Sequence, residues 1–316
     1  PTKAGTAGSH GAPLGEDEIA GARQVLGWDH GPFEIPEDIY EGWRAASVCG
    51  AEARAAWEQR LQQSAHLEAF IAQLSGEAPV EALEALKAHV KSLLADKPKL
   101  ATRAASGKAI DAFWRAHPGL IGGSADLTGS NNTRGAGQQP ISAPDYKGEY
   151  IHYGVREHGM AAAMNGMALH GGIRPYGGTF LVFSDYCRPA VRLAALMNQA
   201  SIFVFTHDSI GLGEDGPTHQ PVEHLAALRA MPNLAVFRPG DAVETAEAWI
   251  AILKRTDGPS ALVLSRQAVP HLRGDDGSQN LTARGAYVLR EPEARRRSPS
   301  SGPGPSCISP SKLLKS

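Results

Sequence analysis

Short apolar runs alternate with longer amphipathic stretches from about residue 100 onward. The runs are GLIGG, YIHYGV, IRPYGG, SIFVF, LAVFRP and SALVLS, at residues 119–123, 150–155, 173–178, 201–205, 234–239 and 260–265. The segments between them include stretches of ten or more residues with helical spacing of apolar positions. Strands that alternate with helices of this length predict βαβ units. We therefore expect an α/β fold with a helix-covered, largely parallel sheet.

The first hundred residues show a different pattern. Residues 1 to about 34 are glycine-rich, with one short helical stretch, EDEIAGARQVL. Proline suits the first turn of a helix, so Pro36 predicts the start of one long helix that continues to Leu74. A further helix is expected from Val80 to about Ala95. Both long segments are rich in helix-forming residues and show no chemical constellation, so we interpret them as packing or connecting helices.

The composition changes again after about Glu293. RRRSPSSGPGPSCISPSKLLKS contains five basic residues, four prolines, seven serines and no acids. This composition is typical of disorder. A regulatory basic tail is one interpretation. An out-of-frame or truncated end is the other, and the abrupt break after the strand-like GAYVLR favours it.

Composition and charge exclude several classes of function. The chain has 316 residues, 42% of them apolar, which allows one to three domains. The net charge of −2 argues against nucleic acid or an anionic membrane as partner. No apolar run approaches the roughly 20 residues of a membrane span, and the first residues lack the apolar core of a signal peptide. The missing initiator methionine suggests a processed chain or a fragment. Cys49, Cys187 and Cys307 are too far apart for a disulfide framework or a zinc motif, which favours a reducing cytosol.

Reactive side chains follow the predicted strands. In open parallel sheets, ligands bind beyond the carboxyl ends of the strands. The residues at or just after these ends carry acidic, aromatic, imidazole and guanidinium groups: Asp126, Glu157, Phe180, His207, Arg238 and Arg266. We therefore expect the functional site at this edge of the sheet.

The stretch THDSIGLGEDGPTHQP, residues 206–221, concentrates two histidines and three acids after the run SIFVF. Residues 211–216 match the dinucleotide pattern GxGxxG, but Glu214 and Asp215 would stand where a pyrophosphate needs bare amides. Pro217 also lacks a donor. A loop whose glycines let the backbone approach a polar ligand, with His207, Asp215 and His219 facing it, is favoured. For any one of these residues, a solvated surface loop remains the alternative.

Seven segments, in order, resemble transketolase: GTAGSHGAPLG, ATRAASGKAI, LIGGSADLTGSN, GVREHGMAAAMNG, GGTFLVFSDY, THDSIGLGEDGPTHQP and VLSRQ. The resemblance extends from residue 1 to about 290. It implies the end of a diphosphate-binding domain and a helical linker at 1–68, and a pyrimidine-binding domain at 69–278. The start of a truncated C-terminal domain and a disordered tail would occupy 279–316. It also implies thiamine diphosphate as cofactor, bound between the subunits of a homodimer.

The resemblance assigns a cofactor site. Glu157 of REHGM matches the catalytic glutamate, whose carboxyl beside the aminopyrimidine N1′ favours the imino tautomer that takes the C2 proton. Without the resemblance, a helix N-terminal glutamate that stabilises the dipole is the stronger interpretation. Phe180, Phe183 and Tyr186 match the aromatic pocket around the pyrimidine, although ordinary core packing is an equal alternative for Phe183. Asp126 of GSAD matches an acid near the cofactor.

The resemblance also assigns a substrate channel. His10, His207 and His219 match its histidines, which can shuttle protons as a carbon–carbon bond breaks. His219 is expected near the reacting carbon, and His207 and Asp215 at sugar hydroxyls.

A sugar-phosphate site is implied at the mouth of this channel. Arg103, Ser130 and Arg266 match its residues, since guanidinium groups suit a phosphate. A surface salt bridge is the alternative for each arginine. His158, His224 and Arg238 are expected to be structural.

One family motif is absent. The GDG…N motif, which holds the diphosphate through Mg²⁺, lies upstream of the matching region in this family, and GDDGSQN at 274–280 lacks the strand and spacing of such a site. No metal ligand is therefore assigned, and the Mg²⁺ ligands are expected in a region missing from this chain. The chain alone is expected to bind the cofactor poorly and to turn over little.

The favoured function is a cytoplasmic transketolase, which moves a two-carbon ketol unit from a ketose phosphate to an aldose phosphate. The same transfer serves the pentose phosphate pathway and carbon fixation. Dihydroxyacetone synthase and deoxyxylulose phosphate synthase remain alternatives within the same chemistry. A truncated module that dimerises without turnover is the alternative outside it.

Overall fold

The computed structural model describes residues 1–291, which fall into two units: residues 1–67, and residues from 68 onward, called the sheet unit below. The predictions for the basic tail and for Cys307 lie outside the described residues. The first unit contains η1 (Ala7–Ser9), α1 (Glu16–Leu26) and α2 (Glu37–Gln62). Neither α1 nor α2 has a buried residue. Large apolar side chains such as Trp43, which is 77% exposed, therefore lie open in this chain.

The single long helix expected from Pro36 to Leu74 is wrong, because the chain leaves the helical path after Gln62. A second helix, α3, spans Leu67–Leu74. In the break, the hydroxyl of Ser64 accepts a hydrogen bond from the backbone N–H of His66 at 3.1 Å. A serine side chain that bonds to nearby backbone groups competes with helix hydrogen bonds in this way.

The sheet unit contains a six-stranded sheet in which every pairing is parallel, in the order β3-β2-β4-β5-β7-β6. The strands are β2 (Leu120–Ser124), β3 (Tyr150–His152), β4 (Arg174–Phe180), β5 (Ile202–Thr206), β6 (Ala235–Phe237) and β7 (Ser260–Leu264). Each corresponds to one predicted apolar run, so the expected parallel α/β fold is confirmed. The residues of β5 and β7 are all buried, as expected for strands covered on both faces.

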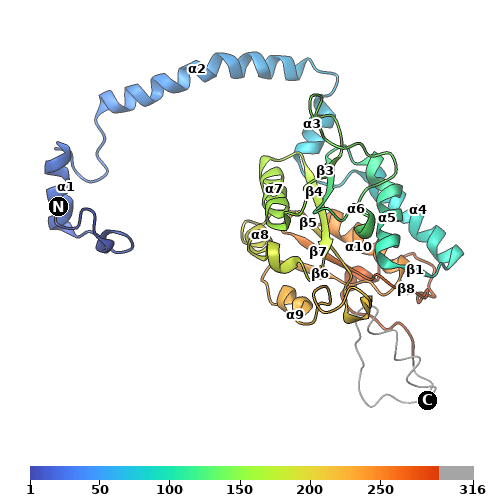
Figure 1. Ribbon diagram of the computed structural model, residues 1–316. Coiled ribbons are helices and arrows are strands. Elements are labelled where there is room, and N and C mark those ends of the chain that lie inside the picture. Colours follow the sequence, from blue (N-terminus) through green and yellow to red (C-terminus); the bar gives the residue numbers. More distant parts are fainter. Residues whose placement is uncertain (292–316) are drawn as a thin grey trace. The chain divides into compact units, whose positions relative to one another are not determined.

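Helices cover both faces of this sheet (Figure 1). The helical segments of the sheet unit after α3 are α4 (Val80–Asp96), α5 (Thr102–Phe113), η2 (Trp114–Ala116), α6 (Thr128–Asn131), α7 (Glu157–His170), α8 (Ser184–Leu196), η3 (Ile210–Leu212), α9 (His224–Arg229), α10 (Ala242–Lys254) and η4 (Thr282–Arg284). One core joins α4, α5 and α10 to the sheet around Trp249, and the other joins α7 and α8 to it around Phe203. No helix among residues 1–291 has the length and apolar character needed to cross a membrane.

The strand order reverses direction at the pair formed by β2 and β4. From β2 the chain passes to β3 on one side and then to β4 on the other. Such a switch point opens a crevice at the carboxyl ends of the strands. Here α6 lies against β4, and glycine permits the close approach. A Cβ atom on Gly178 would lie only 2.6 Å from Cγ2 of Thr133 and 3.0 Å from Nδ2 of Asn131.

Candidate active site

Five rings form a continuous cluster at the carboxyl ends of β4 and β5. Phe180 stacks on His207 with a centroid distance of 3.7 Å and on Phe183 at 5.6 Å. Phe183 in turn stacks on Tyr186 at 5.7 Å. The His219 ring meets Phe180 edge-on at 5.9 Å and Phe183 at 5.2 Å. The cluster therefore joins β4, the start of α8 and both ends of the 206–221 loop around Phe180.

Glu157, the first residue of α7, lies against β4, the strand that ends in Phe180. It is only 6% exposed, and the hydroxyl of Thr179 donates a hydrogen bond to its Oε1 at 3.2 Å. Burial, and after it the charge of Glu157, raise the pKa of Cys187 in α8 to about 12. Glu157 thus lies close to both β4 and α8. The residues that it influences, Thr179 and Cys187, are the sequence neighbours of the cluster members Phe180 and Tyr186.

His207 has an unusual backbone and an uncharged ring. Its φ of 58° lies in the left-handed region, which costs a non-glycine residue of order 1 kcal/mol. The stack on Phe180 and a 2.9 Å contact between its Nδ1 and Oγ1 of Thr206 hold it there. Burial, followed by the charge of Arg103, lowers the pKa of His207 to about 4. The imidazole is therefore neutral at physiological pH.

Two arginines are brought together by a buried pair of hydroxyl residues. Thr102 begins α5 and Ser265 follows β7; the N–H of Thr102 donates to Oγ of Ser265 at 3.0 Å, and the N–H of Ser265 donates to Oγ1 of Thr102 at 2.7 Å. A two-stranded antiparallel sheet of β1 (Leu100–Ala101) and β8 (Ala268–Val269) flanks this pair. Arg103 and Arg266, the next residue in each segment, consequently emerge side by side.

Acidic groups and a carbonyl surround these arginines. Nη1 of Arg103 donates to the carbonyl oxygen of Ser130 at 2.7 Å, and Arg266 pairs with Glu214. Burial and then the charge of Arg266 lower the pKa of Arg103, whereas Asp215 acts in the opposite direction. The positive charge of Arg266 disfavours that of Arg103, so an anion bound between them would relieve this repulsion.

Comparison with known proteins identifies the family. The family model described as "Transketolase, pyrimidine binding domain" matches residues 98–271, and "Transketolase, thiamine diphosphate binding domain" matches residues 1–79. The chain belongs to the transketolase family. It is 59% identical to the transketolase of Cereibacter sphaeroides over 297 residues, covering 94% of this chain and 45% of that protein. Identity to the transketolase of Sinorhizobium medicae is 54%, covering 91% of this chain and 41% of that protein.

Solved transketolases share the fold. The enzyme from Leishmania mexicana superposes with a TM-score of 0.75 at 44% identity, covering 84% of this chain and 40% of that one. The Pichia stipitis enzyme in complex with sedoheptulose 7-phosphate superposes with a TM-score of 0.80 at 37% identity. The match covers 90% of this chain and 43% of that one. The chain therefore spans less than half the length of the transketolases it matches.

Most of the residues that the sequence associates with transketolase chemistry lie together in the sheet unit. Asp215, His219, Arg103 and Arg266 all influence the pKa of His207 electrostatically, so these five groups share one region. The other residues predicted from the sequence do not belong to this group of five. Asp126, which follows β2 with a φ of 63°, is exposed; Ser130 contributes its backbone carbonyl to Arg103; and His10 belongs to the first unit.

The 206–221 loop lacks the geometry of a dinucleotide site. A 3-10 helix, η3, occupies residues 210–212, and the next α-helix begins only at His224. A strand, a tight turn and an immediate helix, which that site needs, are therefore not present in the loop.

Sequence reasoning missed several groups that support the site. Asn131 and Thr206 are fully buried and hydrogen-bonded to each other at 2.7 Å. Asparagine and threonine are common in turns and strands, so the sequence did not mark these two residues as part of the site before the fold was known. Arg238, expected to be structural, forms a buried ion pair at 3.0 Å with Asp208, a partner that the sequence did not indicate.

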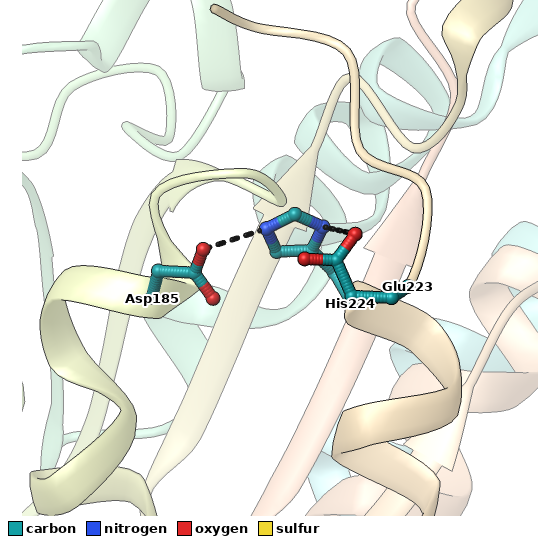
Figure 2. A group of neighbouring side chains, drawn as sticks. All are labelled: Asp185, Glu223 and His224. Carbon is teal, nitrogen blue, oxygen red and sulfur yellow. Dashed lines mark hydrogen bonds and ion pairs between the residues drawn. The ribbon is translucent and has the colours of Figure 1, made fainter.

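Three ligand-type side chains gather between the start of α8 and the start of α9 (Figure 2). Asp185, Glu223 and His224 present atoms within 4.8 Å of one another. Nε2 of His224 faces Asp185 at 3.0 Å, whereas Nδ1 faces Glu223 at 3.8 Å. Because each nitrogen faces a different carboxylate, we interpret the arrangement as a histidine held between two acids. It also lacks the oxygen-rich ligand set that Mg²⁺ prefers.

Two histidines make the stability of the sheet unit pH-dependent. Burial, followed by the charge of Arg174 for His117 and of Arg103 for His207, lowers the pKa of each to about 4. Unfolded, both titrate near 6.5, so the unfolded state binds protons that the folded state excludes as the pH falls. From pH 7 to pH 5, we expect the free energy of unfolding to fall by roughly 2 kcal/mol per histidine.

Urea unfolding at the two pH values measures this loss. His117→Gln should remove about half of it, whereas the exposed control His170→Gln should leave it unchanged. Equal unfolding free energies at pH 7 and pH 5 would contradict the neutral, buried state of both rings.

Proposed function

We propose that the protein containing this chain is a transketolase that moves a two-carbon ketol unit from a ketose phosphate to an aldose phosphate. The observation that carries the proposal is the convergence of three kinds of group at one edge of the sheet. A buried carboxyl, Glu157, is hydrogen-bonded to Thr179, the residue before Phe180 in a cluster of stacked rings, and that cluster adjoins a pair of arginines through His207. Acid–base chemistry, ring binding and phosphate binding each need one of these groups.

The described residues fit the pyrimidine half of thiamine diphosphate. Phe180, Phe183 and Tyr186 offer ring faces, and Tyr186 remains 64% exposed in this chain. Glu157, buried and hydrogen-bonded to Thr179, can share a proton with a ring nitrogen. When bound, the cofactor supplies the nucleophilic carbon that carries the two-carbon unit. The chain's own residues bind the ring, exclude water and hold the proton; Asp126 is proposed near the cofactor.

The histidines and arginines are proposed to handle the sugars. His219 is proposed to exchange a proton with the oxygen next to the reacting carbon, and His10, which belongs to the first unit, is proposed as a further histidine of a substrate channel. His207 and Asp215 recognise sugar hydroxyls. Arg103 and Arg266 bind the phosphate together with Ser130, whose carbonyl oxygen accepts from Arg103. The similar Pichia stipitis transketolase forms a complex with sedoheptulose 7-phosphate, which supports a sugar phosphate as substrate.

The assembly extends beyond this chain. We propose a diphosphate-binding part at residues 1–68, a pyrimidine-binding domain at 69–278, and a C-terminal domain that begins at 279. The exposed rings and helices support a homodimer with the site at the subunit interface. Mg²⁺ would be held by ligands outside this chain. A cytoplasmic location fits the widely spaced cysteines, of which Cys49 and Cys187 are free.

A chimaera tests the proposed function. Residues 1–291 replace the matching segment of the Cereibacter sphaeroides transketolase, which is 59% identical. With xylulose 5-phosphate as donor, we expect transfer to ribose 5-phosphate. Preference for formaldehyde as acceptor would instead favour a dihydroxyacetone synthase. Decarboxylation of pyruvate onto glyceraldehyde 3-phosphate would favour a deoxyxylulose phosphate synthase. A folded chimaera without transfer to any acceptor would favour the non-catalytic module.

Removing one arginine should weaken phosphate recognition selectively. In the chimaera, Arg266→Gln is expected to raise KM for xylulose 5-phosphate by about 10- to 100-fold, the worth of a charge-assisted hydrogen bond. KM for the same ketose without its phosphate should be unchanged, because that sugar has no phosphate to contact Arg266. Lys91→Gln, which removes a charge from an exposed position of α4, is the matched control. An equal rise in KM for the ketose with and without its phosphate would refute a phosphate-specific role.

A further inference from the structure

The tip of the 206–221 loop is a tight turn of two acids between two glycines. The backbone N–H of Gly216 donates to the carbonyl oxygen of Gly213 at 3.2 Å, which places Glu214 and Asp215 at the centre of the turn. Gly213 has a φ of 92° and Gly216 a φ of 74°, values that favour glycine. A Cβ atom added at either glycine would meet no atom within 4 Å. The turn therefore has open space around both of its ends.

Each acid of this turn acts on one of the two arginines proposed for the phosphate. Glu214 forms an ion pair with Arg266. Burial and then the charge of Arg266 lower the pKa of Arg103, and the charge of Asp215 opposes both effects. Asp215 therefore lies close enough to Arg103 to influence its charge. The two carboxylates thus supply negative charge where a bound phosphate would also supply it.

The pair between Glu214 and Arg266 is exposed and weak. The side chain of Glu214 is 76% exposed and that of Arg266 is 33% exposed. Exposed ion pairs contribute little, because water and salt screen the charges and two long side chains must be ordered. The pair between Arg273 and Glu247 has the opposite construction. Both of its side chains are at most 2% exposed, and two hydrogen bonds of 2.7 and 3.0 Å join them. Glu214 can therefore leave Arg266 at little cost.

A phosphate is able to replace Glu214 because it can bind both arginines at once. A phosphate monoester carries about 1.5 to 2 negative charges at neutral pH and has three terminal oxygens, so it can accept hydrogen bonds from two guanidinium groups. The carboxylate of Glu214 pairs with Arg266, whereas Nη1 of Arg103 donates to the carbonyl oxygen of Ser130. The exchange of Glu214 for a phosphate therefore adds a second charged partner.

We propose that Glu214 is an internal competitor of the substrate's phosphate, which pairs with Arg266 until a phosphate binds between Arg266 and Arg103 and displaces it. The proposal rests on the proposed function, which assigns the phosphate to these two arginines. Glu214 then sets the specificity of the site for anions. A substrate that ends in a carboxylate only exchanges one carboxylate for another, whereas a phosphate gains the attraction of both arginines. Glu214 thus favours sugar phosphates over sugar acids.

A positioning role for Glu214 predicts the opposite result. If Glu214 held Arg266 in the orientation that a phosphate needs, its removal would weaken phosphate binding. If Glu214 competes with the phosphate, its removal strengthens phosphate binding by up to about fivefold, the worth of an exposed ion pair. The direction of one measured change in affinity therefore separates the two roles.

Binding of inorganic phosphate to the 316-residue chain, measured by ³¹P NMR at constant ionic strength, tests the competition directly. Glu214→Gln keeps the shape of a side chain that is 76% exposed, so packing is not disturbed. We expect this change to tighten phosphate binding about two- to fivefold, and Arg266→Gln to weaken it. Glu223→Gln removes the same charge from a side chain that is 73% exposed, and this matched control should leave phosphate binding unchanged.

The chimaera extends the test to the sugar phosphate. Glu214→Gln should lower KM for xylulose 5-phosphate about two- to fivefold. The value of kcat, and KM for the same ketose without its phosphate, should stay unchanged. In a chimaera that already carries Arg266→Gln, the gain from Glu214→Gln should disappear, because Glu214 acts through Arg266.

Three results would overturn the proposal. They are phosphate binding that is unchanged, weaker or absent in Glu214→Gln, an equal gain in Glu223→Gln, and a gain that persists in the Arg266→Gln background. A folded chimaera without two-carbon transfer would refute the proposed function. The phosphate titration of the 316-residue chain would still decide the role of Glu214 in that case.

Discussion

Replacing Glu157 with glutamine is expected to abolish two-carbon transfer in the chimaera, with kcat lowered by roughly 10³-fold or more. Glutamine has nearly the same shape and can still bond to Thr179, but it cannot exchange a proton with the cofactor ring. The carboxyl is 6% exposed, so water cannot easily replace it. Turnover is measured with xylulose 5-phosphate and ribose 5-phosphate at saturating thiamine diphosphate.

The control for this substitution is Glu81→Gln, an exposed position on α4. It removes a carboxylate remote from the aromatic cluster and should leave kcat unchanged. Near-normal turnover in Glu157→Gln would reject the acid–base role and return this residue to the simpler role of stabilising the N-terminus of α7.

Truncation of Phe180 to alanine should cost the most stability of any change within the cluster. The ring is 6% exposed and packs against His207, Phe183 and His219. Losing this buried ring and leaving a cavity should lower the free energy of unfolding by about 3–4 kcal/mol. Urea unfolding of the 316-residue chain measures the loss. The His207 ring should also become more exposed, which would move its pKa from about 4 back towards 6.5.

Leu196→Ala serves as the comparison, because that side chain is 67% exposed at the end of α8. A change within about 0.5 kcal/mol is expected there. If Phe180→Ala cost no more than Leu196→Ala, the stacked rings would not form a structural unit, and the geometry assigned to His207 would lose its main support.

The sequence alone was sufficient for the sheet. Each of its six strands coincides with a short, mainly apolar run, since a strand covered on both faces needs few polar positions. The rule that ligands bind at the carboxyl ends of parallel strands then placed Glu157, Phe180 and His207 together. The arrangement of these side chains agrees with that placement, because Phe180 stacks on His207 and the preceding residue, Thr179, bonds to Glu157.

Other features depend on contacts that no local pattern encodes. The strands β1 and β8 have two residues each, too few for periodicity, yet they flank the Thr102–Ser265 pair that aligns the arginines. Asn131 is 75 residues from Thr206 in sequence, so only the switch point in the strand order brings them together. The break between α2 and α3 depends on a local serine bond that helix propensity does not reveal.

The most direct test is a crystal structure of the chimaera with thiamine diphosphate. The account predicts that the pyrimidine ring packs against Phe180 and Phe183, and that the carboxyl of Glu157 lies within hydrogen-bonding distance of a ring nitrogen. A pyrimidine ring bound elsewhere, or a Glu157 carboxyl turned away from it, would contradict the assignment of this edge of the sheet as the active site.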